Sequence, residues 1–230
     1  MKNGSGYLTP KTINENTQSI KGLYEPSFEH DSCGIGFLAN LDGIPENKII
    51  EHALTISERL EHRGGCGCED NTGDGAGILI QIPDEFFRKI AQDYEIDLPE
   101  SGRYGSGMVF LSQNSEKRSK QKKYIESVCT GEKQEVLFWR NVPINDSGIG
   151  PTAKNARPFV EQLFIKASPS IKSQFDFERK LFVIRKLIER GTENLNNIEP
   201  CYFSSLSSKT FCYKGMLLGK IGRASCRERV

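Results

Sequence analysis

Short apolar runs separated by turn-forming residues constrain the fold of this chain more than any other feature. They span residues 34–41, 76–83, 105–112, 136–144, 159–167, 201–208 and 210–218. Their lengths, residue types and bounding turn formers are typical of buried β-strands. The last two runs meet at Ser207, Ser208 and Lys209, which predicts two strands joined by a turn.

Helical periodicity is confined to fewer but longer segments. Residues 45–64 place apolar side chains at helical spacing, with Pro45 near the first turn and Gly64 just past the end. Residues 113–128 are rich in lysine and serine, which indicates the solvated face of a helix rather than a phosphate site. The other helical segments are 84–94 and 175–191, the second with Phe177, Leu181, Ile184 and Ile188 on one face. Many strands and few helices predict layered α/β or α+β packing.

Composition and charge favour a globular protein without a polyanionic partner. The 230 residues suffice for one sizeable domain, and the net charge of +1 gives no reason to expect nucleic acid binding. No apolar run approaches the roughly 20 residues that cross a bilayer, and the N-terminus lacks a secretory signal. We therefore expect a cytoplasmic enzyme or binding domain with reduced thiols and no membrane partner.

Cys33, in the stretch "YEPSFEHDSCGIGF", directly precedes the first apolar run. A cysteine nucleophile needs a base, because the thiolate is the form that attacks. The chain has three histidines, His30, His52 and His62, any of which could pair with it. Cleavage after Ser32 would provide a base without them, since an α-amine has a pKa of roughly 7.7–8.0. Composition alone favours a buried cysteine at a strand end over either arrangement.

Five segments resemble one protein family in the same order and with plausible spacing. They include "SCGIGF", "EHRGG", "TGDGAGILIQIP" and "FSSLSSKT", and they span residues 22–43, 60–83, 142–165, 177–189 and 203–217. Together they are similar to the N-terminal region of glutamate synthase large subunits. That region is a class II glutamine amidotransferase domain and an N-terminal-nucleophile hydrolase. The resemblance implies an α+β fold, a four-layer αββα sandwich, which would be incomplete in this chain.

The resemblance divides the chain before Cys33. Residues 1–32 would be a propeptide, and residues 33–218 the N-terminal part of the amidotransferase domain. In the family the mature N-terminal cysteine attacks the side-chain amide of glutamine and releases ammonia. Water then hydrolyses the glutamyl thioester, and the ammonia is passed to 2-oxoglutarate. The resemblance thus assigns the catalytic role to Cys33.

Arg63 matches the arginine of the family's "HRG" element, which holds the substrate α-carboxylate. A planar guanidinium suits this role because it can pair with both carboxylate oxygens. Without the resemblance, Arg63 would be an ordinary arginine at a helix end. Residues 73–75 are expected to form a turn near the site, with no catalytic role for Asp74.

His62, Cys66 and Cys68 invite a metal interpretation, but the two cysteines are more closely spaced than in most zinc sites. We expect no metal and no cofactor in this chain. The resemblance implies FMN and a 3Fe-4S iron–sulfur cluster in later domains, and FAD in a partner subunit if the enzyme uses pyridine nucleotide. Ferredoxin or the glutamate synthase small subunit would donate electrons. The alternatives are another class II amidotransferase, or a non-catalytic domain that binds glutamine.

Residues 219–230 do not resemble the family. Residues 221–230, "IGRASCRERV", read as the translation of a sequencing adapter, with a basic tail as the alternative. In the family an asparagine and a glycine that form the oxyanion hole come after residue 218. Since loss of one such donor costs about 10²–10³ in rate, we expect this chain alone to be inactive or nearly so.

Overall fold

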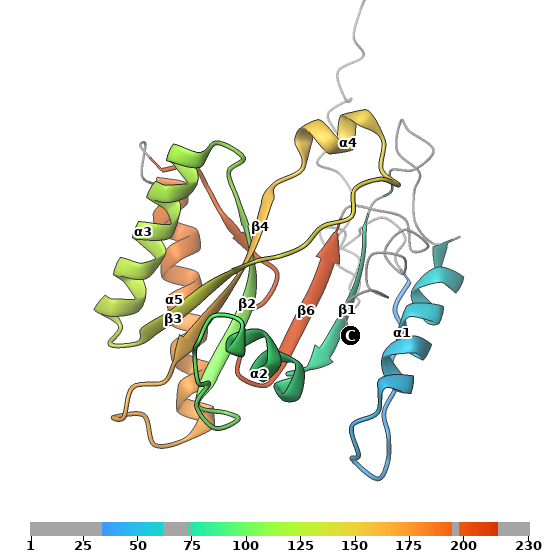
Figure 1. The fold of residues 1–230 in the computed structure, drawn as a ribbon, viewed down its shortest axis with the longest axis horizontal. Coiled ribbons are helices and arrows are strands. Elements are labelled where there is room, and N and C mark those ends of the chain that lie inside the picture. The colour runs from blue at the N-terminus through green and yellow to red at the C-terminus, as the bar shows by residue number, and fades with distance from the viewer. Residues whose placement is uncertain (1–33, 62–72, 74, 195–197, 216–230) are drawn as a thin grey trace, which may run out of the picture. The chain divides into compact units, whose positions relative to one another are not determined.

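The structure is a computed structural model that describes residues 34–61, 73, 75–194 and 198–215 (Figure 1). The chain divides into two units, residues 1–32 and 33–230, and every described residue belongs to the second. Its elements are α1 (Asn47–Arg59), β1 (Ala76–Gln81), α2 (Asp84–Gln92), β2 (Tyr104–Leu111), α3 (Ser115–Gly131), β3 (Glu135–Asn141), α4 (Pro151–Ala156), β4 (Phe159–Lys166), α5 (Gln174–Asn194), β5 (Tyr202–Phe203) and β6 (Thr210–Gly215).

The strands of the described part form two antiparallel sheets. One has the order β3-β4-β2-β5, and the other pairs β1 with β6. The β2–β4 pairing is the longest and runs from Tyr104 opposite Lys166 to Leu111 opposite Phe159. Because neighbouring strands are antiparallel, the packing is α+β rather than α/β.

Helices α3 and α5 cover one face of the four-stranded sheet and lie side by side (Figure 1). The face of α5 that periodicity predicted is fully buried: Phe177, Leu181, Ile184 and Ile188 are each 0% exposed. They pack with Ile125 of α3 and with Val109, Leu163 and Ile165 of the sheet. Each such side chain stabilises the fold by about 1.5–3 kcal/mol.

A second core joins the other face of this sheet to β6 and α2. Phe87 of α2 stands edge-on to Phe164 of β4 at 5.3 Å and to Phe211 of β6 at 5.2 Å between ring centroids. All three rings are 0% exposed. Edge-to-face pairs at this spacing are favourable beyond their buried area, so Phe87 links the two sheets.

The loop between β5 and β6 lies along β2. Ser106 and Ser207 exchange backbone hydrogen bonds of 2.9 and 3.2 Å. The Glu178 carboxylate of α5 accepts from the Ser207 hydroxyl at 2.9 Å and the Ser208 hydroxyl at 2.7 Å. These bonds turn the chain from the four-stranded sheet toward the second one.

The structure confirms some predicted elements and corrects others. All four predicted helices form, and the basic run is helix α3, but α4 was missed although Pro151 at its first turn is a start signal. The strand expected over residues 34–41 does not form, because no described strand pairs with it. The run 201–208 forms only the two-residue strand β5, and β5 and β6 belong to different sheets instead of pairing with each other.

Candidate functional site

The two predicted site residues, Cys33 and Arg63, lie outside the described residues. The same holds for His30, His62, Cys66, Cys68 and Asp74. The structure does describe the residue after Cys33, which is Gly34, and the chain up to Glu61, two residues before Arg63. The structure therefore describes one flank of each predicted site residue.

These flanks contact each other. A Cβ atom added to Gly34 would lie 2.9 Å from Cδ2 of Leu60, the C-cap residue that follows α1. A Cβ atom added to Gly36 would lie 2.6 Å from Cγ2 of Ile56, one turn earlier. The chain that follows Cys33 thus lies directly on the end of the helix that leads to Arg63.

A turn held by Asn40 returns the chain from this segment to α1. Its side-chain amide donates to the Ile44 carbonyl at 3.1 Å and to the Glu46 carboxylate at 3.2 Å. Its side-chain oxygen accepts from the Asp42 backbone amide at 2.9 Å. Gly43 has φ +67°, a left-handed conformation that glycine adopts without strain. The turn and α1 are drawn in blue in Figure 1, and α1 packs on β1.

Large apolar side chains of this region face away from α1. Ile35 and Phe37, which alternate with the two glycines, are 92% and 93% exposed, and Leu41 is 99% exposed. Leu79 of the neighbouring strand β1 is 66% exposed. Four large apolar side chains of this region are therefore open to solvent in the structure.

The described cysteines do not suit nucleophilic catalysis. Burial raises the pKa of the Cys129 thiol to about 12 and that of Cys201 to about 11. Burial also raises the pKa of Cys212. Because the thiolate is the reactive form, the raised pKa values disfavour nucleophilic attack by these three thiols at neutral pH.

Comparison with known proteins identifies the family. The model of the class II glutamine amidotransferases matches residues 33–222. The chain belongs to this family. The match begins at Cys33 and includes both flanks described above.

Several relatives of this amidotransferase domain are glutamate synthases. The chain is 50% identical over 199 residues to the NADPH glutamate synthase large chain of Bacillus subtilis, covering 86% of this chain and 13% of the relative. It is 40% identical over 204 residues to the chloroplastic ferredoxin-dependent glutamate synthase of Oryza sativa, covering 89% and 13%. Ferredoxin-dependent glutamate synthase 2 of Synechocystis is 37% identical over 189 residues, covering 82% and 12%. The chain therefore spans about 13% of the length of these relatives.

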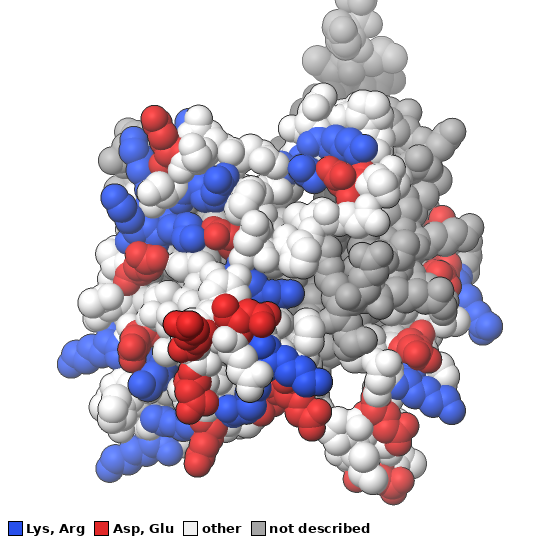
Figure 2. Space-filling model, in the orientation of Figure 1, with Lys and Arg blue, Asp and Glu red and all other residues white. Residues whose placement is uncertain are grey.

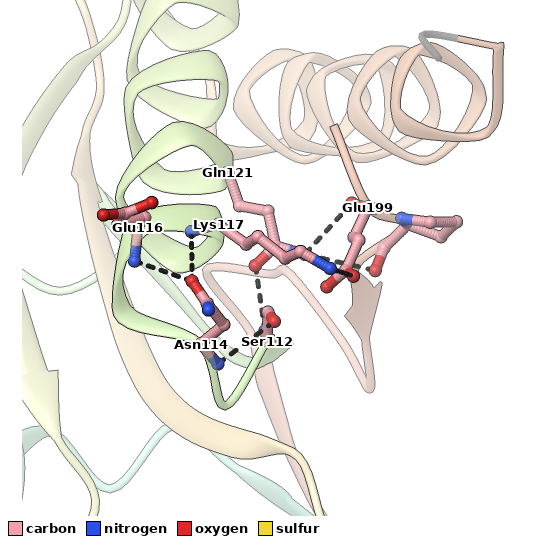
Figure 3. Close-up of polar contacts among 7 residues, drawn as sticks. Ser112, Asn114, Glu116, Lys117, Gln121 and Glu199 are labelled. Atoms are coloured by element: carbon pink, nitrogen blue, oxygen red, sulfur yellow. Dashed lines mark hydrogen bonds and ion pairs between the residues drawn. The ribbon is translucent and has the colours of Figure 1, made fainter. Parts of the chain in front are cut away.

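The basic helix α3 of the amidotransferase domain has a structural role at its N-terminus. The Asn114 side chain accepts from the backbone amides of Glu116 and Lys117 at 3.0 Å each, so these amides are not free to bind a phosphate. Figure 3 shows Lys117 paired with Glu199, and contact with this ammonium lowers the pKa of the Glu199 carboxyl. Gln121 donates to the Glu199 carbonyl at 3.0 Å and accepts from the Ser112 amide at 2.9 Å.

Charge and metal-ligating groups add no second site to the described part of the domain. Acidic and basic side chains are interspersed on the face drawn in Figure 2. No three His, Cys, Asp or Glu side chains among the described residues gather as metal ligands would. No helix of the described ranges is both long and apolar enough to cross a membrane.

Sequence reasoning missed the residues that bring the two flanks together. Gly34 and Gly36 were interpreted only as the start of a strand, and Ile56 was not assigned a contact. The available signal was the alternation of glycine with Ile35 and Phe37, which predicts one bare face on an extended segment.

We expect the buried thiols to resist alkylation. In the folded chain at pH 8, Cys129 and Cys201 should react with iodoacetamide more than about 10²-fold more slowly than after unfolding in urea, because their raised pKa values keep them protonated. Mass spectrometry of digested samples gives the rate at each cysteine. Equal rates in folded and unfolded chains would contradict the expected protection of these thiols.

Proposed function

We propose that residues 33 onward form the glutamine-hydrolysing part of a glutamate synthase. Cys33 is the nucleophile, and Arg63 binds the α-carboxylate of glutamine. The observation that carries the proposal is the contact of Gly34 with Leu60, which joins the flanks of these two residues within a matched class II amidotransferase domain. The burial and raised pKa values of Cys129 and Cys201 also support Cys33 over these two cysteines as the nucleophile.

The proposed reaction uses one amino acid as both nucleophile and base. Removal of residues 1–32 exposes the α-amine of Cys33, which takes the proton of its own thiol. The thiolate attacks the side-chain amide carbon of glutamine, and the C–N bond breaks as the nitrogen receives a proton and leaves as ammonia. A water molecule then adds to the thioester, which yields glutamate and restores the thiol.

Arg63 would fix the substrate for this attack. Its guanidinium can donate two parallel hydrogen bonds to the α-carboxylate of glutamine, which sets both position and orientation. The side-chain amide at the other end of the substrate then lies within reach of Cys33. The short path along the chain from Leu60 to Arg63 supports this pairing.

We propose that the described layers belong to an αββα sandwich. Helices α3 and α5 cover one face of the four-stranded sheet, and the β1–β6 sheet packs on the other. The exposed Ile35, Phe37 and Leu79 would be covered by further parts of the polypeptide. The isolated 230 residues are accordingly proposed to release little or no ammonia from glutamine, which an assay of the purified chain would measure.

The fate of the ammonia is proposed from the relatives. They are named as NADPH and ferredoxin-dependent glutamate synthases, so the full-length protein would pass ammonia to 2-oxoglutarate and take electrons from one of these donors. FMN, the 3Fe-4S cluster and, with pyridine nucleotide, a partner's FAD would lie outside this chain. A cytoplasmic location remains a prediction.

The experiment that tests the proposal uses the full-length polypeptide. Its N-terminal peptide should begin at Cys33, and a glutamine-analogue electrophile should label that residue with loss of glutaminase activity. Mass spectrometry measures both. An active protein that keeps residues 1–32, or one labelled at a different residue, would contradict the proposed function. A processed protein that binds glutamine without hydrolysing it would indicate the non-catalytic alternative.

A further inference from the structure

We propose that Gly36 is a positioning residue for the glutaminase reaction. Its missing side chain lets residues 34–36 lie on Ile56 of α1, and this contact holds the chain that directly follows Cys33 against the helix that precedes Arg63 in the sequence. The inference rests on the proposed roles of those two residues.

The contact between the segment and the helix is closer than any side chain would allow. A Cβ atom at position 36 would lie 2.6 Å from Cγ2 of Ile56, whereas real Cβ atoms essentially never come closer than 3.0 Å to a neighbour. At position 34 a Cβ atom would lie 2.9 to 3.2 Å from three atoms of Leu60. Ile56 and Leu60 are four residues apart and share one face of α1, so both glycines lie on one ridge of the helix.

Gly36 is the more restrictive of the two glycines. Leu60 is the C-cap residue of α1. Its nearest atom, Cδ2 at 2.9 Å, is the far end of a side chain that can change rotamer, and its Cβ lies farther away, at 3.1 Å. Cγ2 of Ile56 is attached directly to Cβ, and a β-branched side chain in a helix has one strongly preferred χ1. A side chain at position 36 would therefore displace the backbone of residues 34–36 rather than Ile56.

The segment is anchored at one end. Its return to α1 is held by the hydrogen bonds of Asn40, so it stays anchored at that end. Cys33 directly precedes Gly34 in the sequence, so the other end of the segment leads to the proposed nucleophile. A displacement at Gly36 is thus transmitted toward Cys33, and an error of about 1 Å at a reacting group can cost about 10²-fold in rate.

The test introduces a clash at position 36 in the full-length, processed polypeptide and compares second substitutions that relieve or retain it. Gly36→Ala should lower kcat for glutamine hydrolysis about 10- to 100-fold and change KM less than about 3-fold, because Arg63 still binds the substrate. Adding Ile56→Ala removes Cγ2 and should restore kcat to within about 5-fold of the parent. Adding Ile56→Val keeps Cγ2 and should restore nothing. Gly131→Ala, where a Cβ atom would meet nothing within 4 Å, is the matched control.

Two readouts separate positioning from folding and from the proposed function. Three results would overturn the positioning role. One is a kcat for Gly36→Ala equal to the parent's, and another is equal rescue of kcat by Ile56→Ala and Ile56→Val. The third is a loss of kcat that follows the folded fraction measured by thermal unfolding. Labelling of Cys33 by the glutamine-analogue electrophile should slow in Gly36→Ala and recover with Ile56→Ala. Failure of the parent protein to be labelled would reject the proposed function itself, whereas a labelled parent and an equally labelled Gly36→Ala would reject only the positioning role.

Discussion

Replacing Cys33 by alanine in the full-length polypeptide is expected to lower ammonia release from glutamine by at least about 10³-fold. The thiolate forms the covalent bond to substrate, and removal of a nucleophile eliminates that pathway entirely. A coupled assay for ammonia measures the loss. Arg63 is unchanged in this variant, so glutamine should still bind with an affinity close to that of the parent.

Two controls make the Cys33 result specific. Cys201→Ala removes a thiol of raised pKa and should keep activity within about 2-fold. The mass of the N-terminal peptide of Cys33→Ala shows whether residues 1–32 were removed, which separates loss of the nucleophile from loss of cleavage. Residual activity above about a tenth of the parent's in a processed Cys33→Ala protein would contradict the assignment.

Gly107→Ala is expected to reduce the free energy of unfolding by about 2–4 kcal/mol, an effect at the upper end for overpacking. A Cβ atom on Gly107 would lie 2.1 Å from the Ser205 carbonyl oxygen and 3.2 Å from the Leu206 Cα. These are backbone atoms, so no rotamer change can relieve the clash. The β5–β6 loop would have to move off β2, which would break the Ser106–Ser207 backbone pair.

Urea unfolding of the 230-residue chain measures this loss. Trp139 is the single tryptophan of the sequence and packs against the core that β2 shares with α5, so its fluorescence reports unfolding of that region. The unfolding midpoint of Gly107→Ala should fall by about 1 M or more. Gly131→Ala, whose new methyl group meets no neighbour, should leave the midpoint nearly unchanged. A similar small shift for both variants would show that the loop is not held tightly on β2.

The helices illustrate how far the sequence alone can predict this fold. The buried face of α5 is predicted by the spacing of Phe177, Leu181, Ile184 and Ile188, because the helical period places these side chains on one face independently of the rest of the fold. Strand partners carry no comparable local signal. β1 pairs with β6 rather than with a neighbour in sequence. β5 and β6 follow each other in the sequence but belong to different sheets, and Glu178 binds the loop between them.

The candidate site also combines features that the sequence predicts with features that only the tertiary structure shows. The roles proposed for Cys33 and Arg63 came from the resemblance of five sequence segments to one family, because residue chemistry alone favoured a buried cysteine and an ordinary arginine at these positions. The contacts of Gly34 with Leu60 and of Gly36 with Ile56 were decided by tertiary structure alone. The physical reason is range: helical periodicity and residue chemistry act over a few neighbouring positions, whereas close packing depends on which distant side chains the fold brings face to face.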